Sequence, residues 1–201
     1  MLSGFRYLPG YFDADQQKAL MEELRTVVAA APFYRPKMPR SGRPFSVEMT
    51  NAGPLGWFSD RAGYRYITHH PISGNPWPDI PSVASALWQD LADYPAAAQC
   101  CLLNFYREEG ARMGLHQDRD EEVFDAAVIS ISLGNTAVFR IGGTTRRGPT
   151  SSLKLYSGDV VMLTGAARLA FHGIDRVLGG SSRLLREGGR LNLTLRRVTR
   201  P

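Results

Sequence analysis

Residues 190–196 read Arg190-Leu-Asn-Leu-Thr-Leu-Arg196, an unbroken alternation of polar and apolar side chains. Successive side chains of a β-strand point to opposite faces of the sheet, so this pattern predicts a strand with leucines on one face. The polar face carries an arginine at each end of a segment that extends over about 20 Å. Exposure to solvent is the simpler explanation of this face. The alternative is that the two arginines grip the two ends of a small dianion.

Short runs of the same β type continue upstream as far as residue 100, separated by glycine, proline and charged turns. About eight strands at this spacing predict an all-β sandwich or barrel, for which a double-sheet jelly roll is one solution. The predicted strands are Cys101–Tyr106, Met113–Asp118, Ala127–Leu133, Ala137–Ile141, Ser152–Tyr156, Asp159–Leu163, Leu169–His172 and Arg190–Val198.

Helices and irregular chain are expected before this region. Residues 13–16 have the Asp-x-x-Gln form of a capping box, and apolar residues follow at helical spacing until Pro32. A second helix is expected over residues 81–93. Between the helices, residues 32–81 are rich in proline, glycine, arginine and aromatic side chains, with one probable strand at Phe45–Met49 and otherwise irregular structure. The sequence therefore predicts a helical and loop-rich N-terminal portion packed on a β-sandwich.

The composition is that of a single globular domain. The chain has 201 residues, of which 43% are hydrophobic and 21% charged. No stretch approaches the ~18 apolar residues of a membrane span, and no charged start followed by an apolar run suggests a signal peptide. The adjacent Cys100 and Cys101 lie in an apolar run and are expected to be buried free thiols. We expect a cytoplasmic protein with no membrane partner, and nothing demands more than a monomer.

The positive charge is unevenly distributed. Lys and Arg number 24 against 19 Asp and Glu, which gives a net charge of +5. Basic residues gather in residues 35–43 and again in residues 176–200, and arginine is far commoner than lysine in both. Arginine presents a planar fork that matches phosphate or carboxylate oxygens. This charge fits either a nucleic-acid partner or a solvated basic surface, and the solvated surface is the simpler interpretation.

The histidines indicate a metal centre. His116 and Asp118 are two positions apart in a predicted strand, so they face the same side about 6.6 Å apart. His172 lies in another predicted strand, and two histidines with one carboxylate form the facial triad of non-haem Fe(II) oxygenases. A hydrogen-bonded core histidine is the alternative for His172. The pair His69 and His70 lies in the irregular segment and is interpreted as surface or loop, without a metal.

Taken together, these motifs resemble the AlkB family of Fe(II)/2-oxoglutarate-dependent nucleic-acid dealkylases. Each motif is weak alone, but their order and spacing are highly specific. The matching pieces are Met49-Thr50-Asn51, Leu55-Gly56-Trp57, Gly63-Tyr64-Arg65-Tyr66, Pro76-Trp77-Pro78, Asn104-Phe105-Tyr106, Leu115-His116-Gln117-Asp118-Arg119-Asp120-Glu121, Ser130-Ile131-Ser132-Leu133-Gly134, Gly142-Gly143, Gly158-Asp159-Val160-Val161, Phe171-His172-Gly173 and Asn192-Leu193-Thr194-Leu195-Arg196.

The resemblance implies one dioxygenase domain over residues 1–201. Its core is a double-stranded β-helix, or jelly roll, over residues 100–201, and residues 32–81 form a nucleotide-recognition lid. The implied metal is Fe(II), with 2-oxoglutarate and O2 as cosubstrates. The residues that match the iron ligands, which are also the catalytic residues, are His116, Asp118 and His172. Those that match 2-oxoglutarate contacts are Asn104, Tyr106 and Arg190 at the distal carboxylate, with Asn192 and Arg196 toward the near end.

The implied reaction is oxidative demethylation of N1-methyladenine and N3-methylcytosine in DNA, with single strands preferred and formaldehyde, succinate and CO2 released. A methyl group on the pairing edge of a base is inaccessible inside a duplex, so the base must be flipped out or unpaired. Such bases carry positive charge, which favours a nearby carboxylate. The residues that match substrate contacts are Trp57, Tyr64, Asp120 and Arg146. Without the resemblance, core packing for Trp57 and a solvated carboxylate for Asp120 are the simpler interpretations.

Some residues depart from the pattern of the AlkB family, and two alternative functions stay open. Leu163 and Ala170 stand where bulkier or aromatic residues are expected near the cosubstrate, so the pocket is expected to be wider or its oxygen access altered. Arg140 and Arg147 add positive charge around the Gly142-Gly143 turn, either as phosphate contacts or as a solvated loop. The alternatives in function are RNA demethylation by the same chemistry and a non-catalytic β-sandwich that binds nucleic acid through its arginines.

Overall fold

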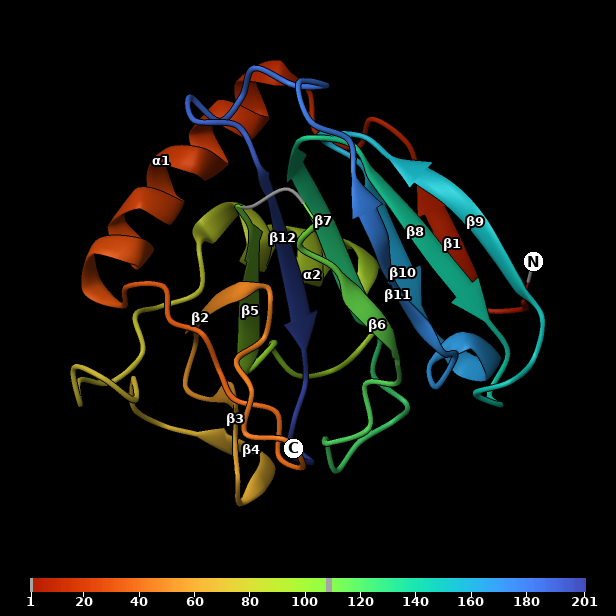
Figure 1. Cartoon of the computed structure of the whole chain (residues 1–201), viewed down its shortest axis with the longest axis horizontal. Helices are drawn as coiled ribbons and strands as arrows, with labels where there is room; N and C mark the ends of the chain where they lie inside the picture. Colours follow the sequence, from red (N-terminus) through yellow and green to blue (C-terminus); the bar gives the residue numbers. More distant parts are fainter. Residues whose placement is uncertain (1, 108–109) are drawn as a thin grey trace.

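Two antiparallel sheets face each other in the computed structural model, which describes residues 2–107 and 110–201 (Figure 1). The larger sheet has, in spatial order, β1 (Phe5–Leu8), β10 (Val160–Leu163), β7 (Val128–Gly134), β12 (Arg190–Arg196), β5 (Cys100–Tyr106) and β2 (Glu48–Ala52). The smaller has β6 (Met113–His116), β11 (His172–Val177), β8 (Ala137–Gly142) and β9 (Thr150–Leu155). A short 3₁₀ turn, Gly165–Ala167, joins β10 to β11. The predicted β-sandwich with N-terminal helices is therefore confirmed.

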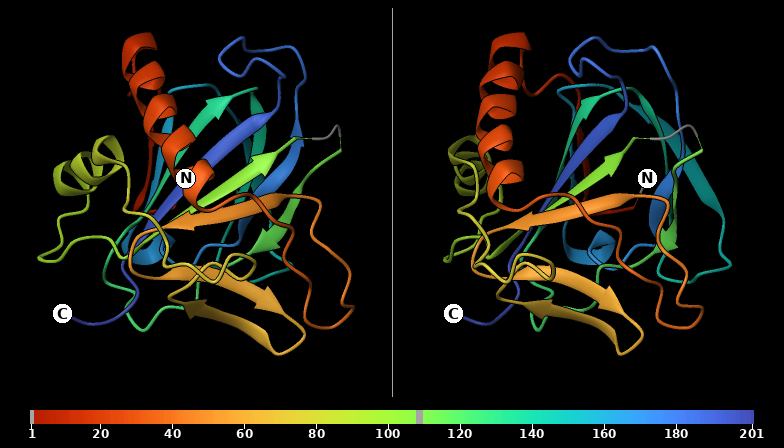
Figure 2. Two further views of the ribbon diagram at one scale, coloured as in Figure 1. Left: turned by 90° about the vertical axis from the view of Figure 1, so that its left-hand side faces the viewer. Right: turned by 60° about the vertical axis from the view of Figure 1, so that its left-hand side comes forward.

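Both helices lie on the outer face of the larger sheet (Figure 2). Helix α1 (Ala14–Ala30) begins at the predicted capping box, where Asp13 and Gln16 accept each other's backbone N–H groups. Helix α2 is Ser82–Leu91. One apolar stripe of each helix is buried against the sheet, which explains why these amphipathic segments are helical here.

The alternation in β12 divides the molecule into two layers. Leu191, Leu193 and Leu195 pack toward the helices. Arg190 and Arg196, with the polar residues between them, point into the space between the sheets and line a cavity there. Every residue of β12 is buried, so the solvent-facing interpretation of its polar face is wrong.

A separate hairpin lies within the region predicted to be irregular. Strands β3 (Gly56–Asp60) and β4 (Gly63–Ile67) pair only with each other and extend from one end of the sandwich in both views of Figure 2. Asp60 accepts the backbone N–H of Ala62 and thereby stabilises the turn. The irregular surroundings predicted for Trp57, Tyr64 and Tyr66 are therefore wrong. The role of residues 32–81 as a lid stays a prediction.

Several strand boundaries also differ from the prediction. The strand expected at Phe45–Met49 is β2, which begins at Glu48 and ends at Ala52. Strand β6 ends at His116, and His172 begins β11 instead of ending a strand. In the described ranges, no helix combines the length and apolar character needed to cross a membrane.

Candidate active site

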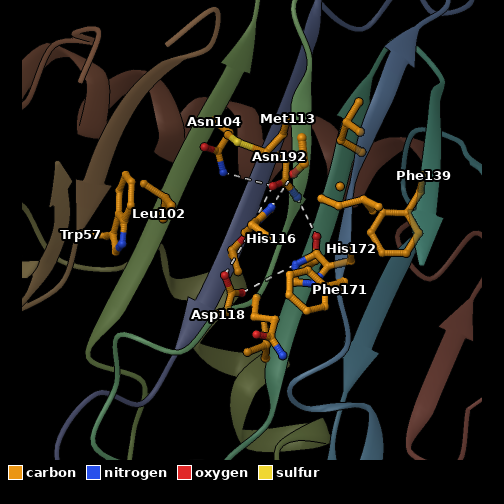
Figure 3. Close-up of a pocket in the computed structure, with 18 of the residues that line it drawn as sticks. Trp57, Leu102, Asn104, Met113, His116, Asp118, Phe139, Phe171, His172 and Asn192 are labelled. Carbon is orange, nitrogen blue, oxygen red and sulfur yellow. Dashed lines mark hydrogen bonds and ion pairs between the residues drawn. The ribbon is translucent and has the colours of Figure 1, made fainter. Parts of the chain in front are cut away.

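A cavity of about 440 Å³ lies between the two sheets. Side chains from β5, β6, β11 and β12 converge on it, and Figure 3 shows Asn104, His116, Asp118, His172 and Asn192 grouped there. The sandwich places them together because each strand turns its inward-facing residues to the same space. All twelve predicted site residues line this cavity.

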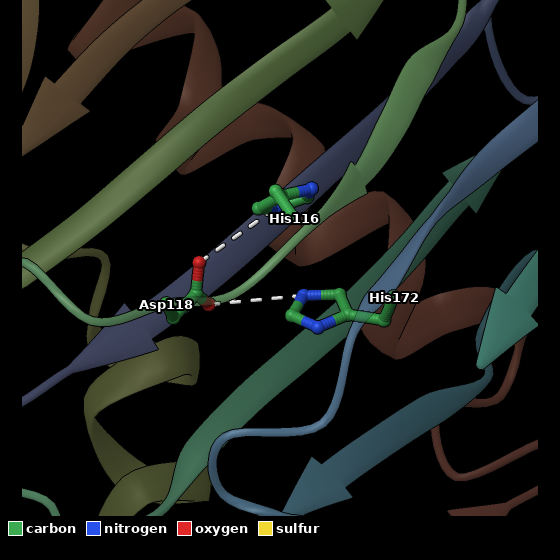
Figure 4. A group of neighbouring side chains, drawn as sticks. All are labelled: His116, Asp118 and His172. Atoms are coloured by element: carbon green, nitrogen blue, oxygen red, sulfur yellow. Dashed lines mark ion pairs between the residues drawn. The ribbon is translucent and has the colours of Figure 1, made fainter. Parts of the chain in front are cut away.

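Three potential metal ligands meet at one end of β6 and β11. His116 and His172 are directly opposite each other across the β6–β11 pairing. Asp118 faces both histidines in Figure 4, with Oδ1 3.7 Å from His116 Nε2 and Oδ2 3.9 Å from His172 Nε2. One ligand atom from each residue lies within 4.8 Å of the others. The predicted juxtaposition is present, but its predicted origin is wrong, because Asp118 lies beyond the end of β6 and not on one strand face with His116.

Backbone carbonyls set the orientation of both imidazoles. His116 Nδ1 is 2.9 Å from Gly114 O, and His172 Nδ1 is 2.9 Å from Ala170 O. A carbonyl can only accept, so each Nδ1 carries a hydrogen, and each Nε2 is the ring nitrogen that faces Asp118. Burial and the neighbouring His116 lower the pKa of His172 to about 4, so the ring is neutral at pH 7. Two imidazoles and a carboxylate are a donor set that fits Fe(II).

The third potential ligand, Asp118, is held as an anion by an arginine. Arg196 contacts both oxygens of Asp118, with Nη2 3.0 Å from Oδ1 and Nε 3.2 Å from Oδ2. Burial opposes ionisation of Asp118, but Arg196 and the two histidines outweigh it and hold the pKa of the carboxyl well below its usual range. Arg196 lines the cavity, yet its guanidinium is already engaged by a carboxylate. Its predicted contact with the near end of 2-oxoglutarate stays a prediction.

At the other end of the cavity, Arg190 is a buried cation without a carboxylate partner among the described residues. Its Nη2 donates to Ser132 Oγ at 2.9 Å, while Nε and Nη1 have no hydrogen-bond partner. Burial lowers the pKa of Arg190. The guanidinium lies 5.1 Å from the ring centre of Tyr106, and Asn104 Oδ1 nearby is also unpartnered. Two free donors on a buried cation fit the distal carboxylate of a diacid.

The cavity opens beside the β3–β4 hairpin. Trp57 stacks on Tyr64 with ring centres 5.5 Å apart, and Tyr64 is 52% exposed. The indole Nε1 of Trp57 donates to Asp120 Oδ2 at 2.9 Å. Arg146 lies across the opening, with its guanidinium 5.9 Å from the ring centre of Phe171. Trp57 also packs against the core between the sheets, and Asp120 is exposed, so core packing and a solvated carboxylate describe part of what these residues do.

Other predicted features have mixed outcomes. Cys100 and Cys101 are buried free thiols, as predicted. The histidine pair was predicted to be surface or loop: His70 does lie in a loop, but it is buried and contacts Pro32 O and the Ser73 side chain. Its ring therefore has a structural role in closing the loop that follows it.

The two departures lie close to the triad. Leu163 is buried and lines the cavity, and Ala170 supplies the carbonyl that contacts His172. Arg140 donates to Thr150 Oγ1 and lies outside the cavity. The wider pocket and the phosphate contacts expected from these residues stay predictions.

Two buried residues next to the triad were missed. Arg168 donates to the backbone oxygen of Asp118 at 2.7 Å and to Glu121 Oε2 at 3.2 Å. In the sequence, Glu121 stands only as the last residue of the motif over residues 115–121. A run of three acids at 120–122 contains no signal for which of them is buried, so sequence reasoning could not have singled it out.

A β-sandwich with this donor set and a buried arginine opposite defines the class of 2-oxoglutarate–Fe(II) oxygenases, and the sequence matches the 2OG-Fe(II) oxygenase superfamily over residues 4–196. It is 54% identical over 200 residues to an alpha-ketoglutarate-dependent dioxygenase AlkB homolog of Caulobacter vibrioides, across 98% of this chain and 89% of that protein. It is 39% identical over 191 residues to the alpha-ketoglutarate-dependent dioxygenase AlkB of Escherichia coli, across 93% and 86% of the two chains. The solved structure of OsALKBH1 superposes with a TM-score of 0.82 at 29% identity, across 98% of both chains. The chain therefore belongs to the AlkB family and is an Fe(II)/2-oxoglutarate-dependent dioxygenase with a jelly-roll fold.

Proposed function

We propose that this enzyme oxidatively demethylates N-alkylated bases such as N1-methyladenine and N3-methylcytosine in DNA, with single strands preferred. The observation that carries the proposal is one cavity lined by the His-Asp-His group, by the buried Arg190 without a carboxylate partner among the described residues, and by aromatic and acidic side chains at its mouth. Fe(II), when bound, supplies the O2 activation that couples decarboxylation of 2-oxoglutarate to hydroxylation of the N-methyl group. The hydroxymethyl product then releases formaldehyde and the unmodified base.

His116 Nε2, His172 Nε2 and one Asp118 oxygen would hold the iron. Three protein ligands leave open positions for the cosubstrate and O2. The free Nε and Nη1 donors of Arg190 would bind the distal carboxylate of 2-oxoglutarate, since a buried cation gains most from an anion brought to it. The remaining predicted 2-oxoglutarate contacts are Asn104 and Tyr106 beside Arg190, and Asn192 and Arg196 closer to the metal.

The mouth of the cavity would receive the damaged base. Trp57 and Tyr64 offer an aromatic surface, and stacking on such a surface contributes about 1–3 kcal/mol per base. Asp120 places a carboxylate beside the indole, where it would attract the positive charge of the methylated base. Arg146 at the opening would contact a phosphate of the same strand.

We further propose that residues 1–201 form one dioxygenase domain with residues 32–81 as the nucleotide-recognition lid and residues 100–201 as its catalytic core. The hairpin within the lid carries Trp57 and Tyr64 to the mouth, which supports this assignment. We expect the enzyme to act as a monomer in the cytoplasm. Light scattering on the purified protein tests the oligomeric state.

The proposed activity is tested by measuring succinate and formaldehyde with Fe(II), 2-oxoglutarate, O2 and an N1-methyladenine oligonucleotide. We expect both products in equal amounts, and neither after chelation of the metal. No turnover by the wild-type enzyme on any methylated strand would contradict the proposal. Binding that depends on salt but not on iron would favour the non-catalytic alternative. A matched RNA oligonucleotide separates DNA from RNA demethylation.

Replacing Asp120 by asparagine is expected to lower kcat/KM on N1-methyladenine by about tenfold, because the pocket loses its attraction for a cationic base. Asparagine keeps the size of the side chain and an oxygen for the Trp57 indole. The same variant is expected to act on neutral N3-methylthymine within about twofold of wild type. Equal losses on both bases would show that Asp120 does not act through charge.

A further inference from the structure

We infer that Glu121 is a positioning residue for the metal centre. Its negative charge offsets one of the two buried arginines around Asp118, so that no excess positive charge opposes metal binding. The inference rests on the proposed metal ligation and adds a residue that the reaction scheme does not use. Glu121 lies three positions beyond Asp118 in the segment that follows β6. Its side chain is 1% exposed.

Glu121 contacts both arginines that hold Asp118. Its Oε2 lies 3.2 Å from Arg168 Nη2, and its Oε1 lies 3.6 Å from Arg196 Nε. Arg168 donates in turn to the backbone oxygen of Asp118, and Arg196 to its carboxylate. Tyr66 of β4 donates its hydroxyl hydrogen to Glu121 as well. Glu121 thus accepts hydrogen bonds from Arg168 and Tyr66 and forms an ion pair with Arg196, all around the metal ligand.

The charges of this cluster balance only when Glu121 is ionised. Asp118 and Glu121 are the two carboxylates, and Arg168 and Arg196 are the two guanidiniums, all with side chains no more than 6% exposed. The histidine ligands add no charge when neutral. Without the Glu121 carboxylate, one buried positive charge would be left in excess beside a site for a dication. Interactions between buried charges are screened only weakly, so this excess would oppose metal binding.

The positions of Asp120 and Glu121 relative to the cavity show that Glu121 acts on the metal centre and not by contact with the substrate. Asp120, one position earlier, lines the cavity and faces Trp57, whereas Glu121 does not line the cavity. Glu121 can therefore influence the metal through Arg196 and Arg168 but does not reach a bound base in this arrangement. Residues that orient metal ligands in this way typically change metal affinity by about 10–100-fold when they are replaced.

The test measures Mn(II) affinity of the full chain from the electron paramagnetic resonance signal of free Mn(II). Glu121→Gln keeps the side-chain length and an acceptor oxygen for Arg168, removes the charge and replaces the oxygen that faces Tyr66 and Arg196 by an NH2 group. We expect the Mn(II) dissociation constant to rise at least tenfold. The matched control is Glu122→Gln, the same change at the next, exposed position, which is expected to stay within about twofold of wild type.

A double variant distinguishes charge balance from simple damage to the fold. Glu121→Gln with Arg168→Gln removes one charge of each sign, so we expect Mn(II) affinity to return to within about threefold of wild type. Unfolding temperatures of the metal-free proteins monitor folding. If the double variant binds Mn(II) tenfold more weakly than wild type, the inference is overturned. This result can be obtained even if the single variant Glu121→Gln fails to fold. A folded Glu121→Gln variant with wild-type affinity would overturn it as well. Failure of the wild-type protein to bind Mn(II) would instead contradict the proposed metal site.

Discussion

Replacing His116 by alanine is expected to lower demethylation by about a thousandfold or more, because two remaining ligands hold the metal poorly. The metal-free protein is expected to keep its unfolding temperature. The His116 side chain is 39% exposed, and its ring hydrogen bond goes only to Gly114 O within the same strand. Formaldehyde release measures the first effect, and thermal unfolding in a chelator measures the second.

Asp118→Ala is the variant with which His116→Ala is compared, in both activity and stability. It removes a ligand of the same centre, so activity is expected to fall as far. It also leaves the buried Arg196 with one carboxylate fewer, and breaking a buried ion pair costs about 3–5 kcal/mol of stability. We therefore expect equal activity losses but a lower unfolding temperature only for Asp118→Ala. Substantial activity in His116→Ala would contradict the assigned ligand set.

Much of the sandwich could be predicted because its strands are regular. The period-two pattern of residues 190–196 predicted both the strand and the division of its faces, since β12 is central and paired on both sides. The capping box at Asp13 and Gln16 was equally clear, because a helix start depends on local hydrogen bonds. The hairpin β3–β4 was missed because its five-residue strands carry no clean alternation.

The site shows where sequence patterns stop being informative. His116 and His172 were brought together correctly, since strand pairing fixes their distance. Asp118 reaches them from a loop, and its position depends on Arg168 and Arg196, which come from distant parts of the chain. A pattern of period two cannot encode such a contact. The burial of Glu121 between the exposed Asp120 and Glu122 is likewise set by tertiary packing and not by local composition.

Replacing Arg190 by leucine is expected to raise the KM for 2-oxoglutarate by about 100-fold or more. Truncating one partner of a buried hydrogen-bonded charge pair costs about 2–5 kcal/mol, and Arg190 offers two donors with no other partner. Metal affinity is expected to stay within about threefold, because the triad makes no contact with this side chain. Succinate release at varied 2-oxoglutarate gives the KM, and Mn(II) titration gives the metal affinity.

Arg190→Leu is expected to weaken cosubstrate binding but not to lower the stability of the cosubstrate-free protein. Without cosubstrate, Arg190 is a buried cation whose Nε and Nη1 lack hydrogen-bond partners, so its contacts with Ser132 and Tyr106 offset only part of its desolvation cost. Leucine removes that cost, and the cosubstrate-free variant should be at least as stable as wild type while losing the thermal shift that 2-oxoglutarate produces. Arg186→Leu, the same change at an exposed position, is expected to alter neither property. A marked fall in stability with equal loss of metal and 2-oxoglutarate binding would point to misfolding and contradict the assignment.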